Sequence, residues 1–151
     1  MKEFNKALNY SFSLLKYRAR SKSEIESRLK LKGYDSSIIV RVIKYLQEAN
    51  FINDCEFARL FTTWKQEKGW GEKKIALALK RLEIDKDLIS EVLKDKEIFR
   101  KKIKELIERK INYYQGENRY QKILRYLISR GFSYSDARAA LNQARLEAYE
   151  N

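Results

Sequence analysis

Apolar residues recur at helical spacing along almost the whole chain, and this feature limits most strongly what the chain can fold into. The 151 residues contain no proline and only 5 glycines. Long alternations of β-branched residues, which would indicate strands, are missing. A spacing of 3.6 residues places the apolar side chains of a segment on one helix face. The sequence therefore predicts an all-α protein.

A pattern of short helix, turn and second helix begins near residue 21. Ile25 and Leu29 share one helix face, and Gly33 ends that helix because glycine adopts the left-handed conformation readily. Asp35 is a good N-cap for the next helix. The apolar stripe of that next helix consists of Ile38, Ile39, Val42, Ile43 and Leu46.

The same pattern returns about fifty residues later and again after a similar interval. The second occurrence comprises Ile75, Leu79, Ile84, the cap Asp85, and Leu88, Ile89, Val92 and Leu93. The third comprises Ile123, Leu127, Gly131, Phe132, the cap Ser133, and Ala137, Ala140 and Leu141. Glu83 stands where the other two have glycine, and a left-handed non-glycine residue costs about 1 kcal/mol or more. We expect that turn to close differently or to carry modest strain.

A longer amphipathic helix precedes each pair, over about 4–18, 54–67 and 96–114. The second of these begins with Asn53 and Glu56 in capping-box spacing and carries Phe57, Ala58, Phe61 and Trp64 as its apolar stripe. The sequence thus predicts three tandem three-helix units, 1–50, 51–96 and 97–151. Each unit alone buries only a thin core, so we expect the units to stack into an elongated, curved array.

The charge is strongly positive, with a formal value of +12, and it is unevenly distributed. The three units carry +6, +1 and +5, so the ends are basic and the middle is nearly neutral. Such a balance favours a polyanion or an acidic surface as partner. The residues predicted to contact it lie in three clusters: Arg18, Arg20 and Lys22; Arg28, Lys30 and Lys32; Arg100, Lys101, Lys102 and Lys104.

The stretch Lys68–Lys74, KGWGEKK, places an aromatic residue between two glycines. It is not a phosphate-binding loop, because the glycines are two apart and no strand precedes them. Trp70, flanked by Lys73 and Lys74, either packs into the core or contacts a base or a protein. Both interpretations stay open, and the three residues join the predicted contact set.

Catalytic and metal-binding groups are scarce. The chain has no histidine, which removes the commonest general base and metal ligand. Cys55 is the single cysteine, so we interpret it as an inert thiol in a reducing compartment. The acidic residues near helix starts are explained by capping and the helix dipole. We expect no enzyme activity and no cofactor, and a cytoplasmic, monomeric protein without a membrane span or a signal peptide.

Three stretches resemble the RecX family of bacterial regulatory proteins, which act on the RecA recombinase. They are Arg18–Tyr34, Ile52–Arg59 and Gly69–Ile75, and the likeness extends over essentially the whole chain. The resemblance implies three tandem three-helix units that insert into the groove of the RecA–DNA filament. It further implies that the recombinase, ATPase and coprotease activities of RecA fall when the protein binds. The family has no catalytic residues, so the resemblance implies none in this chain.

Two other functions compete with this one. A freestanding helix-turn-helix DNA-binding protein would use the helix that begins at Ser36, but Arg41 and Lys44 are its only long donors. That composition favours weak, sequence-independent binding to single-stranded or duplex DNA. The other alternative is a helical-repeat adaptor for an acidic protein.

Overall fold

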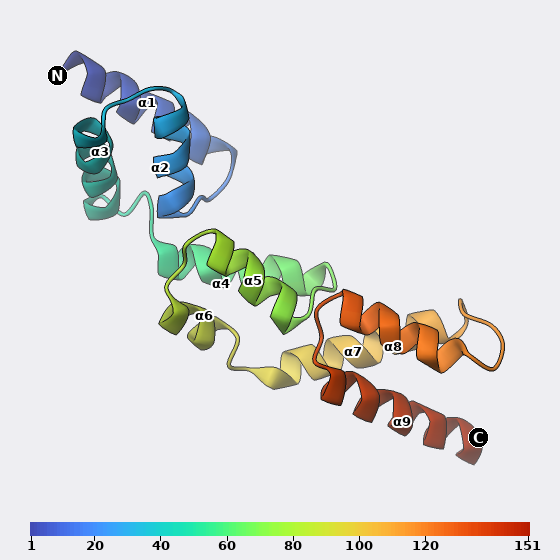
Figure 1. The fold of residues 1–151 in the computed structure, drawn as a ribbon. Helices are drawn as coiled ribbons and strands as arrows, with labels where there is room; N and C mark the ends of the chain where they lie inside the picture. The colour runs from blue at the N-terminus through green and yellow to red at the C-terminus, as the bar shows by residue number, and fades with distance from the viewer.

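The computed structural model describes residues 1–151 and contains nine helices and no strands, which confirms the all-α prediction (Figure 1). The helices are α1 Lys2–Tyr17, α2 Lys22–Leu31, α3 Ser36–Glu48, α4 Asp54–Glu67, α5 Glu72–Arg81, α6 Lys86–Val92, α7 Lys96–Ile111, α8 Arg119–Ser129 and α9 Tyr134–Glu150. The long helices predicted at the start of each unit are α1, α4 and α7. Their observed bounds match the predicted ranges to within three residues at either end.

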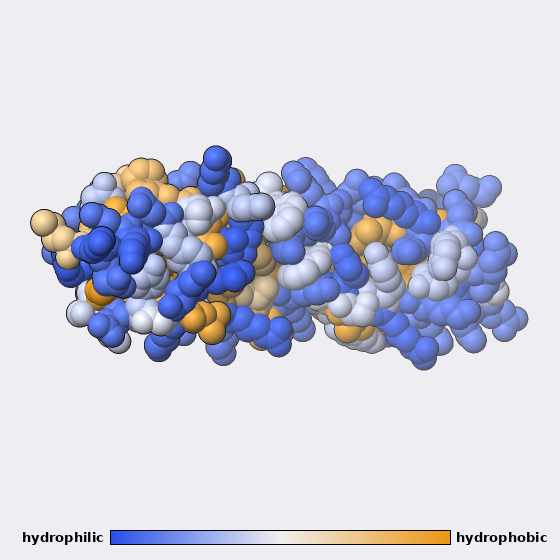
Figure 2. All heavy atoms as spheres, turned by 90° about the horizontal axis from the view of Figure 1, so that it is seen from above, coloured by the Kyte–Doolittle hydropathy of each residue, from blue (hydrophilic) through white to orange (hydrophobic).

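The molecule is elongated, with unit 1 (α1–α3), unit 2 (α4–α6) and unit 3 (α7–α9) following one another from the N-terminus to the C-terminus (Figure 1). Seen from above, its surface is mostly hydrophilic, with small apolar patches distributed along its length (Figure 2). None of the nine helices is both long enough and apolar enough to cross a bilayer.

All three units close the turn after their second helix in the same way. The Gly33 and Tyr34 N–H groups donate to the Lys30 and Leu29 carbonyls, the pair of bonds typical of a Schellman motif. Glu83 makes the equivalent bond to the Lys80 carbonyl at 3.0 Å, although its φ is +57°. Of the two outcomes expected at this position, the structure therefore shows the strained one, because a side chain disfavours the left-handed region.

Side-chain capping is present at five helix starts. The capping side chains each accept a hydrogen bond from a backbone N–H two or three residues later, and they belong to Ser21, Asn53, Asp85, Asp95 and Ser133. Asp35 also occupies an N-cap position, but its side chain makes no capping bond. The cap predicted there is thus positional only.

The buried apolar residues form two cores rather than three. One core lies within unit 1 and its boundary with unit 2, and consists of Ala7, Ile25, Leu29, Ile39, Val42, Ile43, Leu46 and Ile52. The other contains fifteen residues from Phe57 to Leu141 and runs continuously through units 2 and 3. Units 2 and 3 therefore stack as expected, whereas unit 1 is attached to them without sharing a core.

The two junctions between units use the same elements. In each, the start of one unit's second helix meets the turn after the next unit's second helix. At the first junction the Ser23 hydroxyl donates to the Leu82 carbonyl at 2.7 Å, and the Lys22 N–H donates to Asp54 Oδ1 at 2.8 Å. Both bonds involve a side chain.

The second junction is tighter, because backbone meets backbone. The Gly71 N–H donates to the Arg130 carbonyl at 2.7 Å, and the Lys73 N–H donates to the Gly131 carbonyl at 2.9 Å. A Cβ atom on Gly71 would lie 2.2 Å from the backbone nitrogen of Phe132. Only glycine permits this approach, so the residue type at position 71 is required by the contact between units 2 and 3.

Candidate nucleic-acid interface

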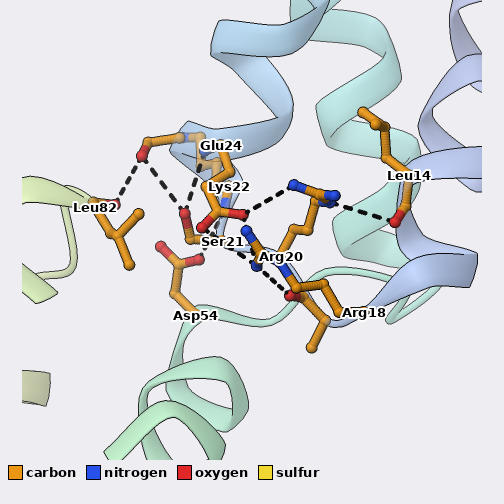
Figure 3. Close-up of polar contacts among 10 residues, drawn as sticks. Leu14, Arg18, Arg20, Ser21, Lys22, Glu24, Asp54 and Leu82 are labelled. Carbon is orange, nitrogen blue, oxygen red and sulfur yellow. Dashed lines mark hydrogen bonds and ion pairs between the residues drawn. The ribbon is translucent and has the colours of Figure 1, made fainter. Parts of the chain in front are cut away.

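The cluster Arg18, Arg20 and Lys22 lies in and after the loop between α1 and α2, where unit 1 meets unit 2 (Figure 3). Arg18 Nη1 is 3.0 Å from Glu24 Oε2, and Arg20 Nη1 is 3.7 Å from the same oxygen. Arg20 Nε also donates to the Leu14 carbonyl at 3.3 Å. The side chain of Arg20 is only 12% exposed, so its cation supports the fold more than it faces a partner.

The environment of Arg20 agrees with that placement. Burial lowers the pKa of its guanidinium, and repulsion from Arg18 lowers the pKa further, while Glu24 opposes both. Lys22 differs, because its Nζ lies 3.8 Å from Glu26 in a half-exposed pair. Within this cluster, Arg18 and Lys22 are the cations that solvent can reach.

The second predicted cluster is the more open one. Arg28, Lys30 and Lys32 are exposed on α2 and its C-terminal turn, and none of them forms an ion pair. Lys32 Nζ lies 5.1 Å from the ring centroid of Tyr10. These three side chains are free to bind an anion at the outer end of unit 1.

The third cluster divides between paired and free cations. Arg100 lies 3.7 Å from Glu97 and 3.7 Å from Asp136 of α9, so it links α7 to α9. Lys102 is 3.3 Å from Glu105 and mostly covered. Lys101 and Lys104 form no ion pair, and they line a groove between α7 and α9.

Trp70 lies at the second junction and is partly buried against the core that units 2 and 3 share. Its ring meets Phe61 edge to face at a centroid distance of 6.5 Å. Lys74 Nζ sits 4.4 Å from its ring centroid, while Lys73 is exposed and forms no ion pair. The position of Trp70 therefore agrees with the packing interpretation, although cations cover the rest of its ring.

Trp64 is the residue that sequence reasoning placed wrongly. It was expected in the apolar stripe of the second long helix, yet it is 47% exposed. The buried face of α4 is formed by Phe57, Ala58 and Thr62, and helical geometry puts position 64 at the edge of that face. Leu60, one turn earlier on the same edge, is 55% exposed.

Trp64, Lys65, Lys68, Trp70 and Lys74 together form an alternating series that we name the Lys–Trp ladder. Lys65 Nζ lies between the two indoles, 4.4 Å from the Trp64 centroid and 4.3 Å from the Trp70 centroid. Lys68 Nζ is 4.6 Å from the Trp64 centroid. Ammonium groups over ring faces are held by the ring quadrupole. The order in space is thus Lys68, Trp64, Lys65, Trp70, Lys74.

The ladder concentrates positive charge on one surface of unit 2, although the net charge of that unit is only +1. Burial lowers the pKa of the Lys65 ammonium, and repulsion from Lys68, Lys74 and Arg18 lowers it further. Acidic residues of unit 2 such as Asp54, Glu56 and Asp87 instead sit in the first turns of helices. The signal that could have found the ladder is the i, i+4 spacing of Trp64 and Lys68 on a helix that leads directly into Trp70.

A groove adjoins the ladder where unit 1 meets unit 2. It is lined by Leu60, Phe61, Trp64 and Lys65 from α4 and by Arg18, Ala19 and Glu24 from the α1–α2 region. Its lining is largely apolar and aromatic, with Arg18 and Lys65 as cations and Glu24 as the one acidic residue. Such a surface can take flat apolar groups that carry negative charge beside them.

Comparison with known proteins shows which family has this architecture. Models of the first, second and third three-helix domains of RecX match residues 7–46, 53–93 and 100–141. The regulatory protein RecX of Caldanaerobacter subterraneus subsp. tengcongensis is 27% identical over 145 residues, covering 93% of this chain and 71% of the relative. That of Haemophilus influenzae is 30% identical, covering 83% of this chain and 86% of the relative.

The fold has a close counterpart among solved structures. The crystal structure of RecX from Lactobacillus salivarius has a TM-score of 0.85 and 24% sequence identity, and the match covers 96% of this chain and 98% of that one. Clostridial regulatory proteins RecX are longer, and this chain spans 56% to 62% of their length.

The fold defines an all-α repeat protein built from three-helix units. All three units match the domain models of one family in the same order along the chain. The chain belongs to the RecX family of regulatory proteins.

Proposed function

We propose that this protein binds the RecA–DNA filament and lowers its recombinase, ATPase and coprotease activities. The observation that carries the proposal is an elongated three-unit array with unpaired cations in every unit, in a chain that belongs to the RecX family. An extended object with cations along its length suits a partner that presents nucleic-acid backbone and protein side by side.

The mechanism we propose is differential affinity. A ligand shifts a polymer toward an inactive or disrupted state only by the amount by which it binds that state more tightly. Unpaired cations such as Arg28, Lys30 and Lys101 supply an attraction to phosphate that does not depend on base sequence. Weak, sequence-independent DNA affinity of the protein itself follows from the same groups.

The test is the DNA-dependent ATPase activity of RecA from the same organism, measured while this protein is titrated in. We expect inhibition at equimolar or lower ratios, which moderate salt reduces but does not abolish. Electron microscopy of the same mixtures on single-stranded DNA would show the protein lying along the filament or the filament shortened. Unchanged ATPase activity together with unchanged filaments would contradict the proposal.

The helix-turn-helix alternative is disfavoured by the packing of α3. Ile39, Val42, Ile43 and Leu46 are buried against α1 and α2, which leaves Arg41 and Lys44 as the outward long donors. Arg41 lies over the Phe4 ring, and Lys44 is 4.0 Å from Glu48. A helix that reads base edges needs more polar side chains on its outward face.

We likewise propose that the protein acts as a monomer in the cytoplasm.

A further inference from the structure

We propose that the Lys–Trp ladder is a binding site for single-stranded nucleic acid. One base stacks on Trp64, and the neighbouring phosphates pair with Lys65, Lys68 and Lys74. This inference assigns the DNA affinity of the proposed function to particular residues. It rests on the proposed function only in taking a nucleic acid as the ligand. It moves the principal contact from the basic ends of the chain to its nearly neutral middle.

The charges of the ladder call for a polyanion. Lys65, Lys68 and Lys74 form no ion pair with any carboxylate, although acidic residues are abundant in the same unit. Their ammonium groups are instead held over the two indoles, at 4.3 to 4.6 Å from the ring centroids. Three like charges kept this close are stabilised by any ligand that places negative charge among them.

The rings call for flat partners. Lys65 and Lys68 lie over the Trp64 ring, and Trp64 is 47% exposed beside Leu60, which is 55% exposed. When a strand binds, a base can take the place of an ammonium on the ring while that ammonium turns to a phosphate. The ring then exchanges a cation–π contact for stacking, and the lysine exchanges it for an ion pair.

The alternation selects a single strand over other polyanions. Along the ladder, cations and flat rings follow one another, as phosphates and bases do along an unpaired strand. A duplex keeps its bases stacked inside and offers only its phosphates. An acidic protein segment satisfies the ammonium groups but brings no flat ring for the indole. At the opposite wall of the groove, Arg18 is paired with Glu24 at 3.0 Å, so it adds no free cation there.

The chain contains its own reporter for this site. Its only two tryptophans, Trp64 and Trp70, both belong to the ladder. We therefore expect intrinsic tryptophan fluorescence to be quenched by a thymidine oligonucleotide of about 16 nucleotides, a length within the range bound by single-strand modules. A duplex of the same length should bind at least about tenfold more weakly and quench little. Poly-glutamate serves as the protein-like polyanion.

The salt dependence of the binding constant reports how many phosphates the protein contacts. Three phosphate contacts predict a slope of log K against log salt of about −2 for a single strand. The triple variant Lys65→Gln/Lys68→Gln/Lys74→Gln should lose most of that slope and at least about tenfold in affinity. The matched control Lys80→Gln/Arg81→Gln/Lys86→Gln removes the same charge from exposed, unpaired cations of the same unit, and should bind as the unchanged protein does.

Stacking is tested separately from charge. Trp64→Ala should weaken binding by about tenfold, while Trp64→Phe should recover part of the loss, because a phenyl ring still stacks. The exposed position of Trp64 means that both variants are expected to fold, and circular dichroism checks this. Quenching in the Trp70→Phe variant, which leaves Trp64 as the only tryptophan, assigns the signal to the proposed ring.

Three results would overturn the inference: equal loss in the two triple variants, tighter binding of duplex or of poly-glutamate than of the single strand, or no effect of Trp64→Ala on a folded protein. Each of them can occur while RecA inhibition persists, which would leave the proposed function intact. Single-strand binding that follows the ladder without any effect on RecA would do the reverse.

Discussion

At Gly131 the backbone combines a left-handed φ of +94° with a neighbour that leaves no space for a side chain. A Cβ there would lie 2.4 Å from Lys74 Cβ and 2.6 Å from the Lys74 backbone nitrogen. Gly131→Ala should therefore lower the free energy of unfolding by about 2–4 kcal/mol, from conformational strain plus overpacking at the second junction. Urea unfolding followed by circular dichroism measures the loss.

Gly33 provides the matched control for that prediction. It has a similar φ of +87°, but nothing lies within 4 Å of an added Cβ. Gly33→Ala should cost only the conformational part, about 1 kcal/mol. Equal losses at the two positions would show that the contact with Lys74 is unimportant.

The pH dependence at Lys65 has opposite signs for stability and for binding. Its pKa lies below 10.5, because burial and the cations Lys68, Lys74 and Arg18 disfavour its charged form, and no carboxylate pairs with it. Between that lowered pKa and 10.5 the unfolded chain binds more protons at this position, so stability due to Lys65 rises with pH. Single-strand affinity should fall over the same window, because Lys65 loses its charge in the folded protein.

Binding and unfolding measured over that alkaline range, with Lys65→Gln as reference, check the prediction. The variant removes the titrating group, so both pH trends should flatten. Parallel rather than opposite trends in the unchanged protein would contradict the environment assigned to Lys65.

At the scale of the helices, Ser21 and Asp35 both occupy N-cap positions, but only Ser21 makes a side-chain capping bond. The buried Ser21 hydroxyl accepts from the Glu24 N–H at 3.2 Å, whereas Asp35 caps α3 without a side-chain bond. Ser21→Ala should cost about 1 kcal/mol of folding free energy, and Asp35→Ala only a few tenths. Thermal unfolding of the two variants distinguishes them, and a larger loss for Asp35→Ala would argue against the geometry seen here.

Helix positions were largely predictable, because periodicity and caps are local properties of the sequence. The bounds of α4 were predicted to the residue, and Gly33 and Gly131 adopt the left-handed conformation expected of them. The candidate site was less predictable. Trp64 falls at the edge of a helix face, where a small rotation decides between core and surface. Arg20 looks like its exposed neighbours in sequence but is covered by contacts with Leu14 and Glu24.

At the scale of the whole molecule, the two cores predict two cooperative units. Leu29 belongs to the core of unit 1, and Ile123 belongs to the core shared by units 2 and 3; both are fully buried. Leu29→Ala should destabilise by about 2–5 kcal/mol but speed amide hydrogen exchange mainly in α1–α3. Ile123→Ala should speed exchange in α4–α9 together. Acceleration confined to α7–α9 would show that the shared core does not act as one unit.

Sequence alone could not reveal this division. The three units have similar internal patterns, and what separates them is the chemistry of the contacts between them. Ser23 and Asp54 supply side-chain bonds at the first junction, whereas Gly71 and Gly131 bring backbones together at the second. Those contacts join positions 32 to 60 residues apart, beyond the reach of any local pattern.

The unequal junctions give the molecule two arms, a short one of α1–α3 and a long one of α4–α9. The long arm is stiffened by a continuous core, whereas the elbow, the junction between the two arms, shares no core and has hydrogen bonds that involve side chains. A partner that binds both arms would therefore act on the angle between them. Arg18 and Trp64 line one groove from opposite sides of that elbow, so a change in the angle would widen or narrow this groove.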